Sequence, residues 1–182
     1  MNWFRLIAVL LGLGLMLTRP PEALGGELES HRAHYLMDLF SADAGSAVTG
    51  VSGAMVYSFN ENCYSWSSET NVKLKVFYSD RGEVETIWSF ASFEAKNGTA
   101  YSFQVRHLRN GSLVELFKGK VNRPVAGAAT TVLYSSPSNL EVHLPSMTLF
   151  PVRHLMELIS AGETGKRMFN RTVFDGTSND NP

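Results

Sequence analysis

Apolar and polar residues alternate with a period of two along most of the chain after residue 30, and this alternation is the strongest constraint on its fold. In the clearest stretch, Val72 and Leu74 fall on one side of an extended backbone and Lys73 falls on the other. Such alternation is typical of antiparallel strands that bury one face and expose the other. Because short turn signals separate the runs, the pattern predicts consecutive hairpins rather than strands joined by helices.

Two Asn-Gly pairs mark the clearest turns, at Asn97-Gly98 and Asn110-Gly111. Both residue types tolerate the positive φ that a type I′ turn requires, so each pair predicts a tight hairpin. The pairs separate predicted strands at residues 84–94, 99–109 and 112–118. Weaker strand patterns follow at residues 128–134, 139–144 and 167–174.

One segment departs from the period of two and predicts a short helix at residues 151–161. Val152, Leu155 and Ile159 share one face of a helix with Met156. Pro151 suits the first helical position, where a missing N–H loses no hydrogen bond within the helix. We therefore predict an all-β fold, an antiparallel meander that curls into a β-spiral or open barrel, with one short amphipathic helix. A closed, lipocalin-like barrel is the alternative.

The first 25 residues predict a secretory signal peptide. A short basic start is followed by an apolar run from Leu6 to Leu17, which is too short for a spanning helix. Ala23-Leu24-Gly25 supplies small residues for cleavage after Gly25. We expect residues 1–25 to be removed and residues 26–182 to form one β-rich domain that is not an integral membrane protein. An uncleaved N-terminal anchor is the alternative.

Charge and cysteine content exclude several classes of protein. With 16 Lys+Arg against 17 Asp+Glu, the chain lacks the basic excess that a nucleic-acid partner would require. Its single cysteine excludes a zinc ribbon and a disulfide-rich scaffold. In an exported chain, Cys63 would be a free thiol, a link to another chain or half of a disulfide whose partner is missing.

No residue pattern predicts catalysis, a metal or a cofactor. Residues 50–54, centred on Ser52, are close to a nucleophile elbow, but the helix that such an elbow needs does not follow. Small residues that ease a bulge or close backbone packing explain this stretch better. His31 and His34 are three apart on an extended segment and point to opposite faces. Basic residues from Lys73 to Arg123 could form a strip for anionic polymers or lipid head groups, or simply be the solvated face of a sheet.

Several segments together resemble the EipB family of alphaproteobacterial periplasmic cell-envelope integrity proteins, long described as a domain of unknown function. The resemblance lies in the order and approximate spacing of Ser30-His31-Arg32-Ala33, Tyr35, Gly53, Met55, Tyr57, Phe59, Cys63, Trp66, residues 88–98, Tyr101, Phe103, Leu144-Pro145, Leu149-Phe150-Pro151, His154-Leu155 and Phe174-Asp175-Gly176. It implies a soluble periplasmic protein without enzymatic activity or cofactor. It also implies resistance to envelope stress through protein partners, such as a tetratricopeptide-repeat protein.

The resemblance also implies a disulfide between Cys63 and a cysteine near the C-terminus, which this chain does not contain. The family pattern continues with further strands beyond Asp175-Gly176. We therefore expect the chain to be a C-terminally shortened member with an unpaired thiol and an unpaired sheet edge.

The function predicted from these observations is a non-catalytic periplasmic factor that supports envelope integrity. The alternative is a carrier that holds a lipid or another apolar ligand inside the curled sheet. In that case the inward side chains of Trp88, Phe90, Tyr101 and Phe103 would line the cavity, whereas otherwise they are simply core residues. An envelope hydrolase is a third hypothesis without an assignable nucleophile and base.

Overall fold

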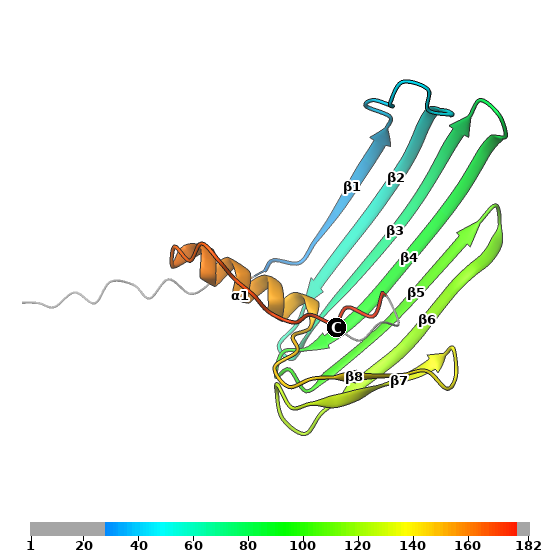
Figure 1. The fold of residues 1–182 in the computed structure, drawn as a ribbon. Helices are drawn as coiled ribbons and strands as arrows, with labels where there is room; N and C mark the ends of the chain where they lie inside the picture. Colours follow the sequence, from blue (N-terminus) through cyan, green and yellow to red (C-terminus); the bar gives the residue numbers. More distant parts are fainter. Residues whose placement is uncertain (1–27, 178–182) are drawn as a thin grey trace, which may run out of the picture.

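A computed structural model describes residues 28–177 of the chain, in which eight antiparallel strands form one strongly curved sheet (Figure 1). The sheet is a simple meander, because the order of the strands in space is their order in the sequence. The strands are β1 (His31–Asp38), β2 (Val48–Glu61), β3 (Ser65–Tyr78), β4 (Gly82–Ala95), β5 (Ala100–Arg109), β6 (Ser112–Asn122), β7 (Thr130–Ser136) and β8 (Glu141–Leu144). One helix, α1 (Pro151–Glu163), follows them.

The all-β meander and its single helix confirm the predicted fold class, and the closed barrel is wrong. Among the described strands β1 and β8 are the sheet edges and do not pair with each other. The sheet curls so far that β7 and β8 run across one end of the longer strands (Figure 1). The predicted signal peptide lies outside the described residues. Within residues 28–177, no helix is long and apolar enough to cross a membrane.

The register of the strands gives the sheet a concave inner face and a convex outer face. Trp88 lies opposite Val72, and Phe90 lies opposite Val105, so these side chains share the inner face. Their neighbours along each strand point outward. On β8, Val142 and Leu144 are buried while Glu141 and His143 are exposed. The period of two in the sequence therefore corresponds to one apolar and one polar face.

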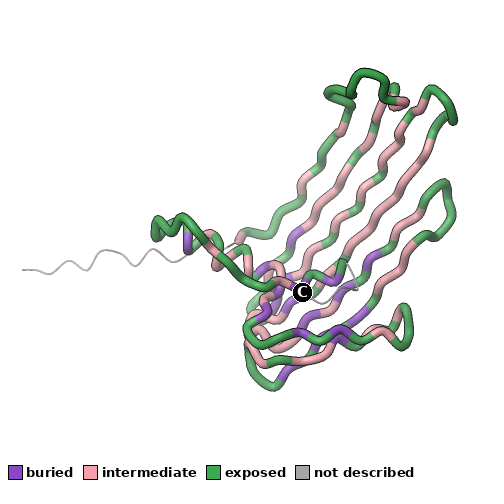
Figure 2. Tube along the Cα trace, viewed as in Figure 1, coloured by how far each residue is buried: buried purple, intermediate pink, exposed green. Residues whose placement is uncertain are grey.

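Burial is concentrated at the end of the inner face that α1 covers (Figure 2). The larger core cluster joins β5 to β8 and the segments on either side of α1; it consists of Tyr101, Phe103, Val121, Val132, Val142, Leu144, Phe150 and Phe174. A smaller cluster, in which Val152 of α1 meets Phe59 and Trp66, attaches the helix to β2 and β3. Away from this end the inner face is only half-buried.

The two Asn-Gly turns differ in conformation. Asn110 and Gly111 both have positive φ, 49° and 78°, and form the two-residue loop between β5 and β6. At the other pair only Gly98 has positive φ, 69°, and the side-chain oxygen of Asn97 accepts a hydrogen bond from the Thr99 N–H. The hairpin predicted at Asn97-Gly98 is confirmed, since β4 pairs with β5 across it. Its turn is not of type I′, because the side chain of Asn97 stabilises a wider loop instead.

The strand predicted at residues 167–174 is also wrong. This segment makes a single parallel bridge, between Val173 and Leu149, rather than joining the sheet. The Leu149 N–H donates to the carbonyl of Thr172, and the Phe174 N–H donates to the carbonyl of Leu149. The alternation in this segment instead reflects the packing of Phe174, which lies in the core beside Tyr101 and Phe103.

Candidate functional site on the concave face

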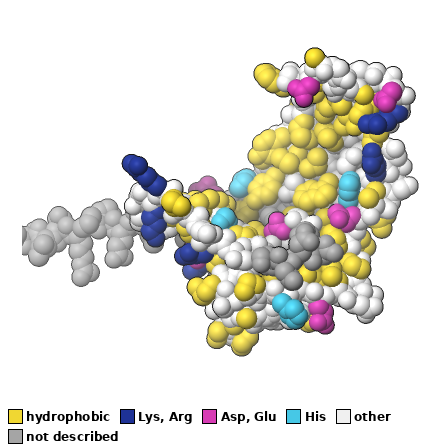
Figure 3. Space-filling model, in the orientation of Figure 1, with side chains coloured by type: hydrophobic (Ala, Val, Ile, Leu, Met, Phe, Trp, Pro, Cys, Tyr) yellow, Lys and Arg dark blue, Asp and Glu magenta, His cyan; other side chains and the backbone are white. Residues whose placement is uncertain are grey.

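The open half of the inner face carries an apolar surface to which β4 contributes the largest side chains. Trp88 and Phe90 stack there with ring centroids 5.8 Å apart and are both half-buried. Figure 3 shows hydrophobic side chains gathered over the concave side of the long strands. Aromatic groups on a half-covered surface supply a large contact area for an apolar ligand or partner.

The other two predicted lining residues lie deeper. Tyr101 and Phe103 are buried, and the ring of Tyr101 stacks on Phe150 at 4.7 Å. The hydroxyl of Tyr101 donates a hydrogen bond of 2.7 Å to the carbonyl of Asp175, and burial raises the pKa of this tyrosine. The structure therefore places Trp88 and Phe90 on the open surface and Tyr101 and Phe103 in the packed core below it.

A space of about 420 Å³ lies between α1 and the end of β1 and β2. Its walls combine apolar side chains from the helix and the sheet, including Leu155 and Phe59, with the rings of His31 and Tyr57. Burial raises the pKa of the Tyr57 hydroxyl above its usual value. The volume and the mostly apolar walls are those of a site for a small ligand.

Glu94 fixes the helix that bounds this space. Its two carboxylate oxygens accept hydrogen bonds from the N–H groups of Val152 and Arg153, at 2.8 and 2.9 Å. Phe150, at the N-cap position, cannot cap the helix because its side chain has no hydrogen-bonding group, and its ring is buried in the core. A carboxylate from β4 thus caps the first turn of α1 from the sheet, where the helix dipole also favours negative charge.

Arg123 lies beside this contact and is buried, although the sequence suggested a basic surface strip that included it. Its Nε donates to the carbonyl of Gly98, and a terminal nitrogen donates to the carbonyl of Thr148. The guanidinium also lies over the ring of Phe150, 4.3 Å from its centroid. Arg123 therefore joins the β4–β5 turn to the segment before α1 and is unavailable to an external anion.

Burial favours the uncharged forms of Glu94 and Arg123 and shifts the pKa of each group accordingly. It raises the pKa of Glu94, against the opposing effect of the two backbone N–H donors and the nearby charges of Arg153 and Arg123. It lowers the pKa of Arg123, and the charge of Glu94 opposes that shift. Since the hydrogen bonds of both groups hold α1 and its flanking segment, the arrangement is structural and positions the helix over the inner face.

The remaining sequence candidates lie apart from this surface. Ser52 is within β2, and no helix follows it, so the strand geometry does not form an elbow. A Cβ added at Gly53 would lie 2.7 Å from the carbonyl oxygen of Lys73, which confirms close backbone packing as the reason for the small residue. Cys63 lies between β2 and β3 as an exposed free thiol. No group of three or more potential metal ligands occurs within residues 28–177.

Sequence reasoning missed Glu94 and the role of Arg123. Both act on residues far away in the sequence; Glu94 contacts Val152, 58 positions later. The available signal was a carboxylate at a predicted inward position on β4, together with a helix that begins at Pro151 without a polar residue before it. A charged side chain on a buried strand face requires partners, and an uncapped helix end supplies them.

A single curved antiparallel sheet, apolar on its concave side and partly covered there by one helix, defines a β-barrel-like protein of the open kind. Comparison with known protein families identifies the class more specifically. The chain belongs to the EipB-like family, whose sequence model matches residues 22–182.

One curated relative is the cell envelope integrity protein EipB of Brucella abortus strain 2308. It is 29% identical over 151 residues, which cover 82% of this chain and 53% of that protein. A crystal structure of a β-barrel-like protein of a domain of unknown function from Brucella abortus matches with a TM-score of 0.72 and 29% identity. That match covers 82% of this chain and 62% of the other. The chain thus spans about half the length of the curated relative.

Proposed function

We propose that this protein is a non-catalytic factor that supports the integrity of the cell envelope from the periplasm. The similarity to the cell envelope integrity protein of Brucella abortus carries this proposal, since it extends over 82% of the chain with the same fold. The N-terminal signal pattern supports export to that compartment. The concave face supports a binding role, because its two buried charged groups, Glu94 and Arg123, hold α1 and the segment before it rather than face a reactive centre.

In this role the protein acts through a periplasmic partner, of which a tetratricopeptide-repeat protein is one kind. Deletion of the gene should make cells sensitive to detergent and to antibiotics that act on the cell wall. A plasmid copy should restore tolerance, and a copy that lacks residues 1–25 should not. A deletion strain as tolerant as its parent would refute the proposal. N-terminal sequencing of the exported protein tests cleavage after Gly25.

The second candidate function is a carrier for a lipid or another apolar ligand. It is favoured by the half-buried stack of Trp88 and Phe90 on the open inner face and by the 420 Å³ space beneath α1. Native mass spectrometry of protein isolated from cells should then detect a discrete apolar mass. Trp88→Ala should lose that mass. Ile87→Ala, which alters the outward neighbour on the same strand, should keep it.

A further inference from the structure

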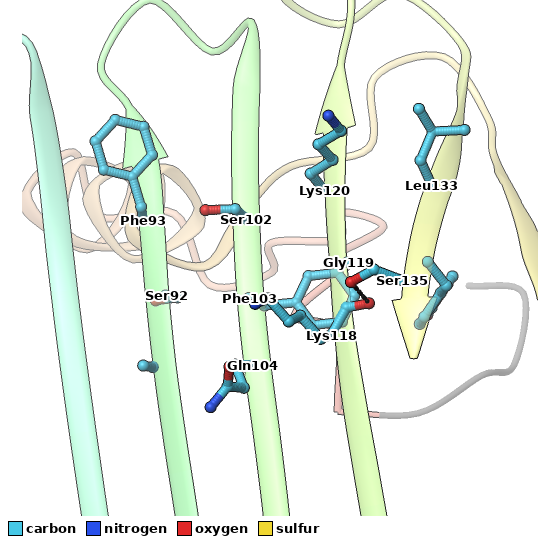
Figure 4. A pocket seen from close by; sticks show the side chains of 12 residues that line it. Ser92, Phe93, Ser102, Phe103, Gln104, Lys118, Gly119, Lys120, Leu133 and Ser135 are labelled. Atoms are coloured by element: carbon cyan, nitrogen blue, oxygen red, sulfur yellow. Dashed lines mark hydrogen bonds between the residues drawn. The ribbon is translucent and has the colours of Figure 1, made fainter. Parts of the chain in front are cut away.

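A groove of about 570 Å³ lies across β4 to β7, away from the helix and its contacts (Figure 4). The outward side chains of Phe93 and Leu133 stand at its two sides, and the smaller Ser102 lies between them on β5. At the β6–β7 boundary the register shifts next to Gly119, and the hydroxyl of Ser135 donates to the carbonyl of Lys118. This irregularity shapes the recess at the point where β7 departs from β6.

The apolar side chains at its edges are accessible to solvent. Phe93 is 43% exposed and Leu133 is 52% exposed, although both belong to regular strands. Phe93 on β4 and Leu133 on β7 are three strand spacings apart, about 14 Å, which is wide enough for an extended polypeptide with its side chains. A recess of this kind suits the side chains of a protein segment better than the flat surface of a bilayer.

The charges of the groove are of one sign. Lys118 and Lys120 line it, are exposed and make no ion pair with any residue of the range 28–177. None of the described residues that line it is acidic. The closest carboxylates by register on this face are Glu69, beside Ala91, and Glu141, beside Leu133, and neither lines the groove.

Other lysines on the outer face have a different environment. Lys73 pairs with Glu85 at 2.9 Å, and Lys75 pairs with Glu83 at 2.6 Å. The glutamates of β4 therefore pair with the lysines of β3, whereas Lys118 and Lys120 on β6 have no such acidic partner among the described residues. Unpaired lysines between exposed apolar side chains are complementary to carboxylates beside apolar anchors.

We propose that this groove binds an extended acidic segment of a protein partner, with apolar side chains of that segment against Phe93 and Leu133. The proposal rests on the partner-dependent role above and assigns it a surface. The two lysines supply long-range attraction and orientation, whereas the apolar contacts supply most of the affinity. Binding through the groove leaves the concave face free.

The test uses the exported protein and a fluorescein-labelled peptide in which glutamate and leucine alternate at the odd positions and serine fills the even positions, so that both kinds of side chain face the groove when the peptide is extended. A peptide with glutamine in place of glutamate serves for comparison. Fluorescence polarisation should show saturable binding of the acidic peptide only. Lys118→Glu with Lys120→Glu should weaken it at least tenfold, as should an increase in ionic strength from about 0.05 to about 0.5 M. Phe93→Ser should weaken it at every salt concentration.

The matched control is Lys166→Glu with Arg167→Glu, which makes the same change in net charge at exposed residues after α1. It should bind as the wild type does. Equal binding of the two peptides, or equal loss in the control and groove variants, would overturn the proposal. So would a result in which the groove variant loses binding only to phosphatidylglycerol vesicles, since the surface would then recognise lipid.

Complementation of the deletion strain separates the two proposals. If wild-type protein restores envelope tolerance and the groove variant, folded by circular dichroism, does not, the groove serves the proposed function. If the groove variant restores tolerance fully, the proposal for the groove is wrong and the integrity role stands. If the deletion has no phenotype, the integrity role fails, while the peptide measurement still decides whether the groove binds acidic segments.

Discussion

Glu94→Ala tests the central structural contact, the cap that β4 supplies to α1. The variant removes two hydrogen bonds to a charged acceptor, and each is typically worth about 1.5–3 kcal/mol. Glu94 is only 1% exposed, so solvent screening does not reduce them. Relief from burying a carboxylate, which is the reason for its raised pKa, offsets part of the loss. We expect a net loss of about 2–4 kcal/mol in the free energy of unfolding.

Thermal and urea unfolding followed by circular dichroism measure this loss. For a domain of this size, the expected fall in Tm is on the order of 5–15 °C. Glu94→Gln should fall between the wild type and the alanine variant, because its amide oxygen still accepts one N–H while its NH₂ group faces the other donor. Glu141→Ala, at an exposed position, should stay within about 0.5 kcal/mol of the wild type. A Glu94→Ala variant equally close to the wild type would refute the assignment of Glu94 as the cap.

Three further predictions concern pH, the core and the turns. Because burial raises the pKa of Glu94 above its unfolded value, the folded state binds the proton more readily. The free energy of unfolding of the wild type relative to Glu94→Gln should therefore rise as the pH is lowered from about 7 to about 4, and a constant difference would contradict this. Phe174→Ala, at a side chain only 4% exposed, should lose about 3–5 kcal/mol in urea unfolding, whereas Met168→Ala, at 91% exposure, should lose almost nothing. Equal losses would show that the segment after α1 is not part of the core. Gly111→Ala should destabilise by about 1–2 kcal/mol because its φ is 78°. Gly162→Ala, inside α1 with open space around it, should raise the free energy of unfolding by about 0.5–1 kcal/mol. If both glycine variants changed the free energy of unfolding in the same direction, the explanation from backbone conformation would be wrong.

The sequence was most informative where one face of a strand is buried and the other is not. Residues 72–78 alternate because Val72 faces inward and Lys73 forms an ion pair on the outer face, so a local pattern reports a local environment. The prediction failed at residues 167–174 because alternation also arises where a single side chain, Phe174, enters a core that distant residues provide. The same alternation of residues arises whether a segment pairs with a strand of the sheet or only packs a side chain into the core.

The candidate site was less predictable than the fold. Trp88 and Phe90 could be assigned to the inner face from their spacing, but the part of that face that α1 covers could not be predicted. The position of α1 is set by Glu94, whose partners are backbone N–H groups, so the sequence shows only an inward carboxylate and a helix start that has no polar residue before it. Lys120 and Arg123 illustrate the same limit, since both are basic residues near the end of β6 and yet one is exposed and the other is buried.

The meander itself has a consequence for how the molecule assembles. Each strand from β2 to β7 pairs only with its immediate neighbours in the chain, so every ladder closes a short loop and loses little chain entropy. The contacts that complete the interior are much less local. The hydroxyl of Tyr101 reaches Asp175, which is 74 residues away. The sheet can therefore grow hairpin by hairpin, while its interior is sealed only when the last described residues arrive.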